Sequence, residues 1–362
     1  MNKEFKFYIE QICREKGLSK EKVIKAIEVA LLSAAKKKFG AKKNVSLQID
    51  PETCEIFISA RKRIVEEVTN PKEEISIEEA EKIAPDKKVG DYLEIPVELQ
   101  DFGRIAAQTA KQVILQKVRE AEREAILNEF KDKVGTIATG VVQRKEKGVY
   151  VVNLGRADAI LPIRETLPNE RLKRGDTVKA YIKEVRMTSK GPEIVLTRTA
   201  PEFVAELFKM EVPEIEDGIV EITKIVREPG ERTKLTVITK DPSIDPVGAC
   251  VGMKGTRVQG IVRELRGERI DIIPYSDDPR VFIARALTPA VVDRIGINEE
   301  DKTAMAVVND QQLSIAIGKR GQNVKLAMKL TGWDIDIISE SEYAKIKEEE
   351  TETQFEDDEN AE

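Results

Sequence analysis

Two stretches in the C-terminal half of the chain repeat one another, and this duplication restricts the possible folds more than any other feature. Residues 247–273 align with residues 313–338, and both stretches end in Ile-Asp-Ile-Ile. Their glycines coincide: Gly252 with Gly318, Gly255 with Gly321, and Gly267 with Gly332. Two β-rich runs precede each copy, and apolar residues at helical spacing flank the first glycine pair. A spacing of 66 residues is too long for a solenoid and predicts two small tandem domains. Each has the order strand, strand, helix, Gly-x-x-Gly, helix, strand.

Each Gly-x-x-Gly lies between two predicted helices, where glycine allows a phosphate to approach the backbone closely because it has no Cβ. Amides at the start of the following helix add a partial positive charge. A KH module clamps four nucleotides of single-stranded RNA in this way. Glycines at helix starts are also common in plain turns, but two copies in the same context favour a binding loop. The residues expected to contact RNA are Gly252, Met253, Lys254, Gly255, Arg257, Gly318, Lys319, Arg320, Gly321, Gln322, Asn323 and Lys325.

Residues 135–200 contain short β-rich runs separated by glycine, proline and charged turns. Five such runs in a segment of this size predict a compact barrel of the OB type. The runs are residues 136–143, 148–154, 157–161, 177–186 and 193–197. The segment carries thirteen Lys and Arg against seven Asp and Glu. Such a basic balance suits a phosphate-rich partner, although a solvated charged face is the simpler interpretation of any one segment.

An OB barrel binds single strands with a basic groove and with aromatic rings on which bases stack. Arg144 and Arg156 are the expected basic contacts, and Tyr150 is the candidate stacking ring. Tyr150 could equally belong to the barrel core, and the sequence leaves both interpretations open. Because aromatic residues are few, the barrel alone is expected to bind RNA modestly.

The N-terminal region mixes helices and strands and ends in a long charged helix. Ser19 is a candidate N-cap and Gly40 a candidate C-cap for the second helix. The predicted helices are residues 2–16, 19–39, about 77–83 and 102–133, and the predicted strands are residues 44–50, 55–65 and 92–99. A helix as polar as the last one usually bridges domains, so we place a domain boundary at Val134-Gly135.

The composition argues against an enzyme. The chain has no histidine, which removes the usual general base and the commonest transition-metal ligand. Its three cysteines are scattered, and no phosphate-binding P-loop or nucleophile elbow is present. From these absences we expect no cofactor and no metal site. The alternative is a nuclease that uses metal ions held by carboxylates alone. The sequence shows neither a signal peptide nor a membrane-spanning run, so we expect a cytoplasmic protein.

Negative charge is concentrated at the C-terminus. The formal net charge is −6, but residues 340–362 alone hold eleven acidic and two basic residues. A segment so acidic and so poor in apolar residues cannot bury enough surface to order itself. We expect residues 346–362 to be a disordered tail.

Several specific stretches together resemble the NusA family of bacterial transcription elongation and termination factors. They are residues 101–104 (Asp-Phe-Gly-Arg) running into 108–113, residues 198–202 (Arg-Thr-Ala-Pro-Glu), residues 245–252 and residues 316–324. The order of an N-terminal domain, an S1-type barrel and two KH domains is also that of the family. The chain departs from some members in lacking the paired acidic repeats after the second KH domain.

This resemblance implies that the N-terminal domain docks on RNA polymerase, with Arg104 and Lys111 as candidate contacts. The barrel and the KH domains would hold nascent single-stranded RNA. The protein would modulate pausing, termination and antitermination as a monomer, together with other Nus-type factors. The alternative is an RNA-processing or ribosome-associated protein with KH and S1 domains.

The expected fold is therefore multidomain α+β. It comprises an α/β N-terminal domain with its connecting helix (1–134), an S1-type OB barrel (135–200), two tandem type II KH domains (201–276 and 277–345) and the acidic tail (346–362).

Overall fold

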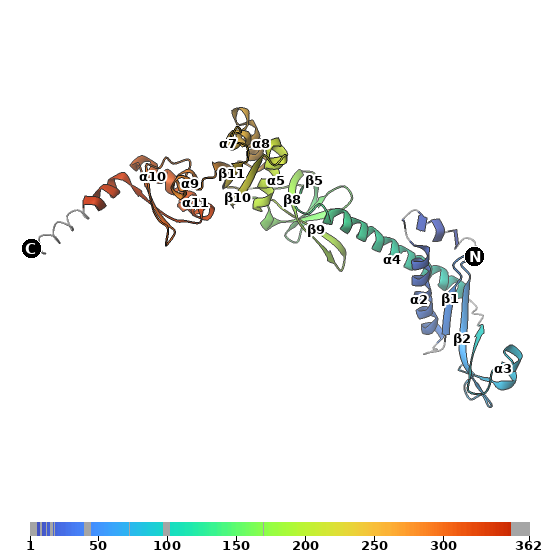
Figure 1. The fold of residues 1–362 in the computed structure, drawn as a ribbon. Helices are drawn as coiled ribbons and strands as arrows, with labels where there is room; N and C mark the ends of the chain where they lie inside the picture. Colours follow the sequence, from blue (N-terminus) through green and yellow to red (C-terminus); the bar gives the residue numbers. More distant parts are fainter. Residues whose placement is uncertain are drawn as a thin grey trace, which may run out of the picture. The chain divides into compact units, whose positions relative to one another are not determined.

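The computed structural model describes residues 6–7, 9–11, 13–14, 17, 19–39, 45–71, 73–96, 102–168 and 170–348, excluding the side chains of 37–39 and 102–107. It forms two compact units, residues 1–128 and 129–362 (Figure 1), which are described separately. Gly40 and most of the predicted acidic tail lie outside the described residues, as does the side chain of Arg104. No helix among the described residues is long and apolar enough to cross a membrane.

The first unit contains the predicted helices and strands. They are α2 (Lys20–Phe39), β1 (Val45–Ile49), β2 (Ile56–Val65), α3 (Ile77–Ile83), β4 (Tyr92–Pro96) and α4 (Phe102–Lys131). A short strand β3 (Glu74–Ser76) was not predicted, and the described residues within 2–16 are helical. Ser19 directly precedes α2. After β1, Asp50 Oδ1 accepts hydrogen bonds from the amides of Glu52 and Thr53 at 2.8 and 2.7 Å. These bonds hold the turn between β1 and β2.

The core of the first unit joins α2, β1 and the first half of α4. Ile27 and Leu31 of α2 are fully buried and share a cluster with Ile49 of β1 and with Ala110 and Ile114 of α4. Because α4 contributes only one stripe to this core, its remaining faces stay polar.

In the second unit, residues 137–197 form a closed five-stranded barrel in the order β5-β6-β7-β9-β8. The strands are β5 (Ile137–Glu146), β6 (Val149–Asn153), β7 (Asp158–Pro162), β8 (Thr177–Thr188) and β9 (Gly191–Thr197). The predicted barrel is therefore confirmed. Gly140 is required on β5, because a Cβ there would lie 2.6 Å from the side chain of Val152 and 2.7 Å from the carbonyl of Asn153.

The repeated stretches form two domains with the same topology. The first has α5 (Pro201–Glu211), α6 (Pro213–Glu216), β10 (Val220–Glu228), β11 (Arg232–Thr239), α7 (Pro246–Val251), α8 (Thr256–Glu264) and β12 (Arg269–Pro274). The second has α9 (Pro279–Ala286), β13 (Arg294–Asn298), β14 (Thr303–Val308), α10 (Asp310–Ile317), α11 (Gln322–Thr331) and β15 (Asp334–Ser339). In each sheet the first two strands are antiparallel and the last two parallel. The leading helices α5 and α9 were not predicted.

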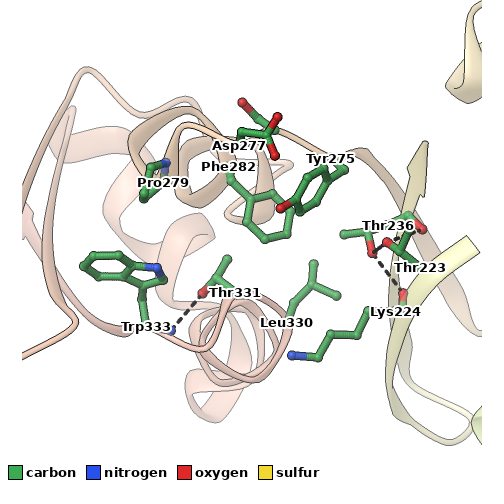
Figure 2. Close-up of a pocket in the computed structure, with 11 residues that line it drawn as sticks. Thr223, Lys224, Thr236, Tyr275, Asp277, Pro279, Phe282, Leu330, Thr331 and Trp333 are labelled. Carbon is green, nitrogen blue, oxygen red and sulfur yellow. Dashed lines mark hydrogen bonds between the residues drawn. The ribbon is translucent and has the colours of Figure 1, made fainter. Parts of the chain in front are cut away.

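The two repeat domains pack on each other through α11 and the first domain's sheet, where Val226 and Ile273 join the second domain's hydrophobic core. Lys234 on β11 is buried, with Nζ 2.8 Å from Asp271 Oδ2 and 2.7 Å from the carbonyl oxygen of Thr288. Burial lowers the pKa of Lys234 to about 8, although the carboxylate of Asp271 opposes the shift. A pocket opens beside this junction (Figure 2).

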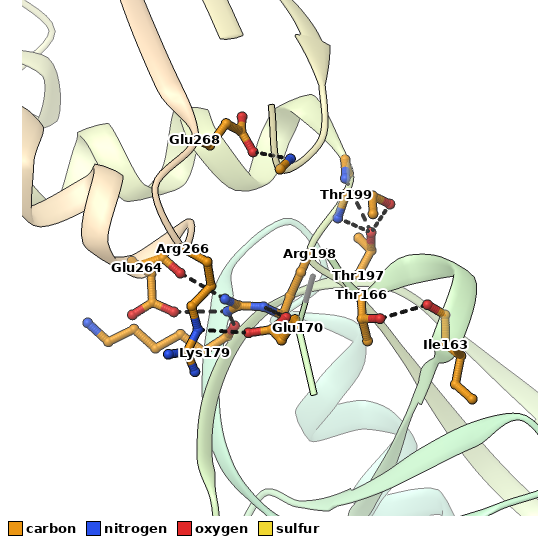
Figure 3. A network of polar contacts seen from close by, with 12 residues as sticks. Ile163, Thr166, Glu170, Lys179, Thr197, Arg198, Thr199, Glu264, Arg266 and Glu268 are labelled. Carbon is orange, nitrogen blue, oxygen red and sulfur yellow. Dashed lines mark hydrogen bonds and ion pairs between the residues drawn. The ribbon is translucent and has the colours of Figure 1, made fainter. Parts of the chain in front are cut away.

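The barrel is joined to the first repeat domain by the guanidinium of Arg198, whose side chain is 1% exposed. Its Nε lies 2.8 Å from Glu170 Oε2, and its Nη1 lies 2.9 Å from Glu264 Oε1. It also donates to the carbonyl oxygens of Lys179 and Glu264 (Figure 3). Because its partners come from the barrel and from α8, Arg198 links the two domains.

Candidate nucleic-acid interface

The two Gly-x-x-Gly loops have the same backbone conformation. Gly252 has φ 73° and ψ 174°, and Gly318 has φ 75° and ψ 171°. Lys254 and Arg320 both have φ 54°, which places non-glycine residues in the left-handed region. Each loop ends an α-helix and begins the next, with its second glycine as N-cap. The two loops thus share one backbone geometry although both of their central residues differ. This is expected if the backbone itself binds the phosphates of RNA.

The two glycines of each loop serve different purposes. A Cβ on Gly252 would lie 2.7 Å from Arg257 Cγ, and a Cβ on Gly318 would lie 2.8 Å from the backbone nitrogen of Asn323. The first glycine is therefore needed so that the following helix can pack against the loop. At the second glycines, Gly255 and Gly321, such a Cβ would make only ordinary contacts, so these glycines are needed for their left-handed backbone, with φ 77° and 72°.

Exposed cations surround both loops. Lys254, Lys319, Arg320 and Lys325 are all exposed, and Lys325 Nζ lies 3.5 Å from the carbonyl oxygen of Arg320. In the first loop, Met253 is 85% exposed at the position that corresponds to Lys319. The second loop therefore carries the higher positive charge and is the stronger candidate for holding phosphate.

Asn323 was expected to contact RNA, and the structure corrects this prediction. Its side chain is fully buried, and its Nδ2 donates to the carbonyl oxygens of Leu287 and Ala316 at 2.9 and 3.0 Å. Asn323 instead holds α10, α11 and the end of α9 together behind the loop. Its Oδ1 has no hydrogen-bond partner among the described residues.

Arg257 and Gln322 are also engaged within the protein. Arg257 Nη1 donates to Glu214 Oε2 at 2.9 Å and to the carbonyl oxygen of Ala249 at 2.6 Å, so it fastens α8 to α6 and α7. Gln322 Nε2 donates to Glu228 at 2.5 Å and to Glu231 at 2.6 Å. A direct contact of either side chain with RNA would require these bonds to break.

The acidic hairpin between β10 and β11 is a feature that the sequence reasoning missed. Its carboxylates at Glu228 and Glu231 reach across to the second loop, and Glu231 Oε1 lies 3.9 Å from Arg320 Nη2. The signal in the sequence is a Pro-Gly turn with a glutamate on either side, between two β-rich runs. Only the packing of one domain on the other brings these carboxylates beside the loop.

In the barrel, Tyr150 is 5% exposed, so the interpretation as a stacking ring is wrong and the core interpretation is confirmed. Lys145 Nζ lies 5.4 Å from the centre of its ring. Arg144 and Arg156 are exposed, and each lies near a carboxylate: Glu146 at 3.3 Å and Glu129 at 3.5 Å, respectively. The barrel therefore presents cations and lacks the predicted aromatic platform at this position.

Lys111, the other candidate contact with polymerase, is exposed on α4 in the first unit. Arg104 lies in the first turn of the same helix. Both residues belong to the N-terminal unit and are therefore separate in the sequence from the loops described above.

Comparison with known protein families matches four successive segments that together cover most of the chain. Residues 4–124 match the NusA N-terminal domain, residues 131–196 the S1 RNA binding domain, residues 198–275 the NusA-like first KH domain and residues 279–345 the NusA-like second KH domain. Curated relatives named transcription termination/antitermination protein NusA are similar over nearly the full length. The protein of Bacillus subtilis is 52% identical, with 96% of each chain covered. That of Halalkalibacterium halodurans is 51% identical (96% of this chain, 91% of the relative), and that of Thermus thermophilus is 41% identical (96% and 92%).

Proposed function

The chain belongs to the NusA family of transcription termination/antitermination proteins, and from this we propose that it couples RNA polymerase to nascent single-stranded RNA. In this proposal residues 1–134 dock on polymerase. The barrel (135–200) and the two KH domains (201–276 and 277–345) hold the RNA. The protein thereby modulates pausing, termination and antitermination.

The observation that carries the proposal is the duplicated loop. Two loops of one geometry lie in two KH domains that pack on each other within one compact unit, and each presents two glycines with exposed cations beside them. Each loop alone would hold a few nucleotides weakly. Joining two weak sites raises the effective concentration of RNA at the second site once the first is occupied. Two weak, linked sites suit a factor that must stay bound to RNA while the strand moves past it.

The polymerase contact is tested with the full chain and purified RNA polymerase. We expect the wild-type chain to co-migrate with polymerase in gel filtration and to change the lifetime of a hairpin-stabilised pause. Lys111→Glu is expected to weaken this association severalfold, because reversing a charge at an interface rim mainly lowers the association rate.

The matched control is Lys82→Glu, which makes the same charge change on α3 of the same unit. It should leave the association unchanged. If the wild-type chain fails to bind polymerase, or if it cleaves RNA in a divalent-metal-dependent manner, the alternative of an RNA-processing protein replaces this proposal.

Neutralising the acidic hairpin is expected to increase RNA affinity. In the double variant Glu228→Gln with Glu231→Gln, both side chains can still accept from Gln322, but two negative charges beside the second loop are lost. Two unit charges about 4 Å apart in water interact by about 1 kcal/mol, so we expect a gain of about fivefold at low salt. Fluorescence anisotropy with a labelled single-stranded RNA measures it.

The corresponding hairpin of the second KH domain supplies the control. Glu299→Gln with Glu300→Gln removes the same charge from the turn between β13 and β14. This variant should bind RNA as the wild type does. Equal gains in both variants would mean that only net charge matters, and the hairpin would have no specific effect on the loop.

A further inference from the structure

A pocket between the two KH domains has the composition of a nucleobase site, although it is separate from both loops. Its volume is about 340 Å³, within the range of small-ligand pockets. Thr223, Lys224 and Thr236 of the first domain's sheet line one side, and Trp333 lies on the opposite side (Figure 2). Leu330 and Thr331, at the C-terminal end of α11, also line it, whereas the second loop lies at the N-terminal end of that helix.

Aromatic rings are concentrated here. Phe, Trp and Tyr make up only 5% of the chain, yet Tyr275, Phe282 and the only tryptophan, Trp333, line this one pocket. Tyr275 is 43% exposed and packs edge-to-face on Phe282, with ring centres 5.3 Å apart. Its amide donates to Val237 and its carbonyl oxygen accepts from Arg285, so the backbone that carries the ring is fixed. A half-exposed ring on a fixed backbone is preorganised for stacking.

The polar groups of the pocket suit the edge of a base. The hydroxyl of Thr223 is exposed and can donate or accept, and it lies 2.7 Å from the hydroxyl of Thr236, which is only 1% exposed and holds it in place. Thr223 projects at a register shift between β10 and β11. Lys224 is exposed and can neutralise the phosphate of a nucleotide held here. Asp277 is the one carboxylate among the described lining residues, so the pocket does not resemble a metal site.

We propose that this pocket holds one unpaired base of a bound RNA strand, stacked on Tyr275 and contacted at its edge by Thr223. This proposal rests on the proposed RNA-binding function and adds a subsite to it. The ten residues of α11 span about 15 Å, comparable with the length of the few nucleotides that one KH domain clamps. A strand held by the second loop could therefore extend along α11 to the pocket.

Because Trp333 is the only tryptophan, its intrinsic emission reports on this pocket in the unmodified full-length chain. We expect a short unlabelled oligoadenylate to change that emission. Tyr275→Leu should abolish the change at saturating RNA and weaken binding about tenfold, the effect of losing one stacked base. Tyr275→Phe keeps the ring and should bind as the wild type does. The control is Tyr92→Leu, which removes a ring of similar exposure, 45%, from the N-terminal unit.

The possible outcomes separate this inference from the function on which it rests. Unchanged Trp333 emission at saturating RNA, or equal affinities of Tyr275→Leu and Tyr92→Leu, would overturn the subsite and leave RNA binding by the loops intact. Adenosine monophosphate that bound as tightly as the oligonucleotide would also overturn it, because the pocket would then be a site for a free nucleotide. A wild-type chain that bound no oligoadenylate would overturn both proposals.

Discussion

Replacing Lys319 and Arg320 together by aspartate is expected to lower the affinity for single-stranded RNA about a hundredfold. Both side chains are exposed in the second loop, next to Gly321. A hydrogen bond to a charged group contributes about 1.5–3 kcal/mol, so losing two phosphate contacts at the lower end of this range costs about 3 kcal/mol, which is a factor of about a hundred. The slope of log affinity against log salt concentration should also become shallower, by an amount that corresponds to about two phosphate contacts. The reason is that fewer counterions are released on binding. Anisotropy titrations over a series of salt concentrations measure both effects.

The fold should survive this change. Arg320 has φ 54°, and aspartate is among the residues that best tolerate the left-handed region. A suitable control is Lys302→Asp with Lys345→Asp, which makes the same charge change at exposed positions of the same domain. Lys302 also has a left-handed backbone, with φ 51°. If the control lost as much affinity as the loop variant, the effect would be one of net charge, and the second loop would not be a binding site.

The first loop allows the opposite change as a further arm of this experiment. Met253 occupies the position that corresponds to Lys319 and is largely exposed. Met253→Lys should therefore raise the affinity for RNA. It should also steepen the slope of log affinity against log salt concentration by an amount that corresponds to about one phosphate contact. Opposite shifts in the two loops would be difficult to explain unless both loops face the same RNA.

The sequence was sufficient for those parts of the fold that local patterns determine. The barrel strands and the two repeated domains could be predicted because turn residues and period-two or helical spacing mark each element, and because the duplication supplied a second copy of each signal. The helix α4 could be predicted because no proline or glycine interrupts it after Gly103. The leading helices α5 and α9 were missed, although each begins with a proline at its first turn, a recognised start signal.

The site was harder to predict, because exposure depends on tertiary packing. Asn323 and Lys325 lie two positions apart on α11, yet one is fully buried and the other exposed, since consecutive helical positions face in different directions. Tyr150 could be assigned to the core only from the three-dimensional structure of the closed barrel. Glu228 and Glu231 approach the second loop only because one KH domain packs on the other. No local pattern encodes such a contact.

The link between the barrel and the first KH domain depends on Arg198, and Arg198→Ala should destabilise that junction by about 3–5 kcal/mol. The side chain of Glu170 is only 2% exposed, and without the guanidinium it would be a buried carboxylate whose remaining cation is Arg266 at 3.5 Å. Breaking a buried ion pair by removing one partner has a cost of this size. Arg198 also lies 5.3 Å from the ring centre of Phe203, so packing on α5 is lost as well. Hydrogen exchange followed by mass spectrometry, on peptides from β8, β9 and α8, measures the local free energy of opening.

Two comparison variants identify the cause of this loss. Arg186→Ala breaks an exposed pair with Glu193 in the same barrel and should cost less than about 1 kcal/mol. Arg198→Met with Glu170→Gln removes both charges and should recover most of the stability, because the unpaired buried carboxylate is then absent. A double variant as unstable as Arg198→Ala would show that the hydrogen bonds of Arg198 to Lys179 and Glu264 dominate instead. In either case a loosened junction should lower RNA affinity even though no RNA contact is altered, because the barrel and the KH loops would no longer be held at a fixed distance.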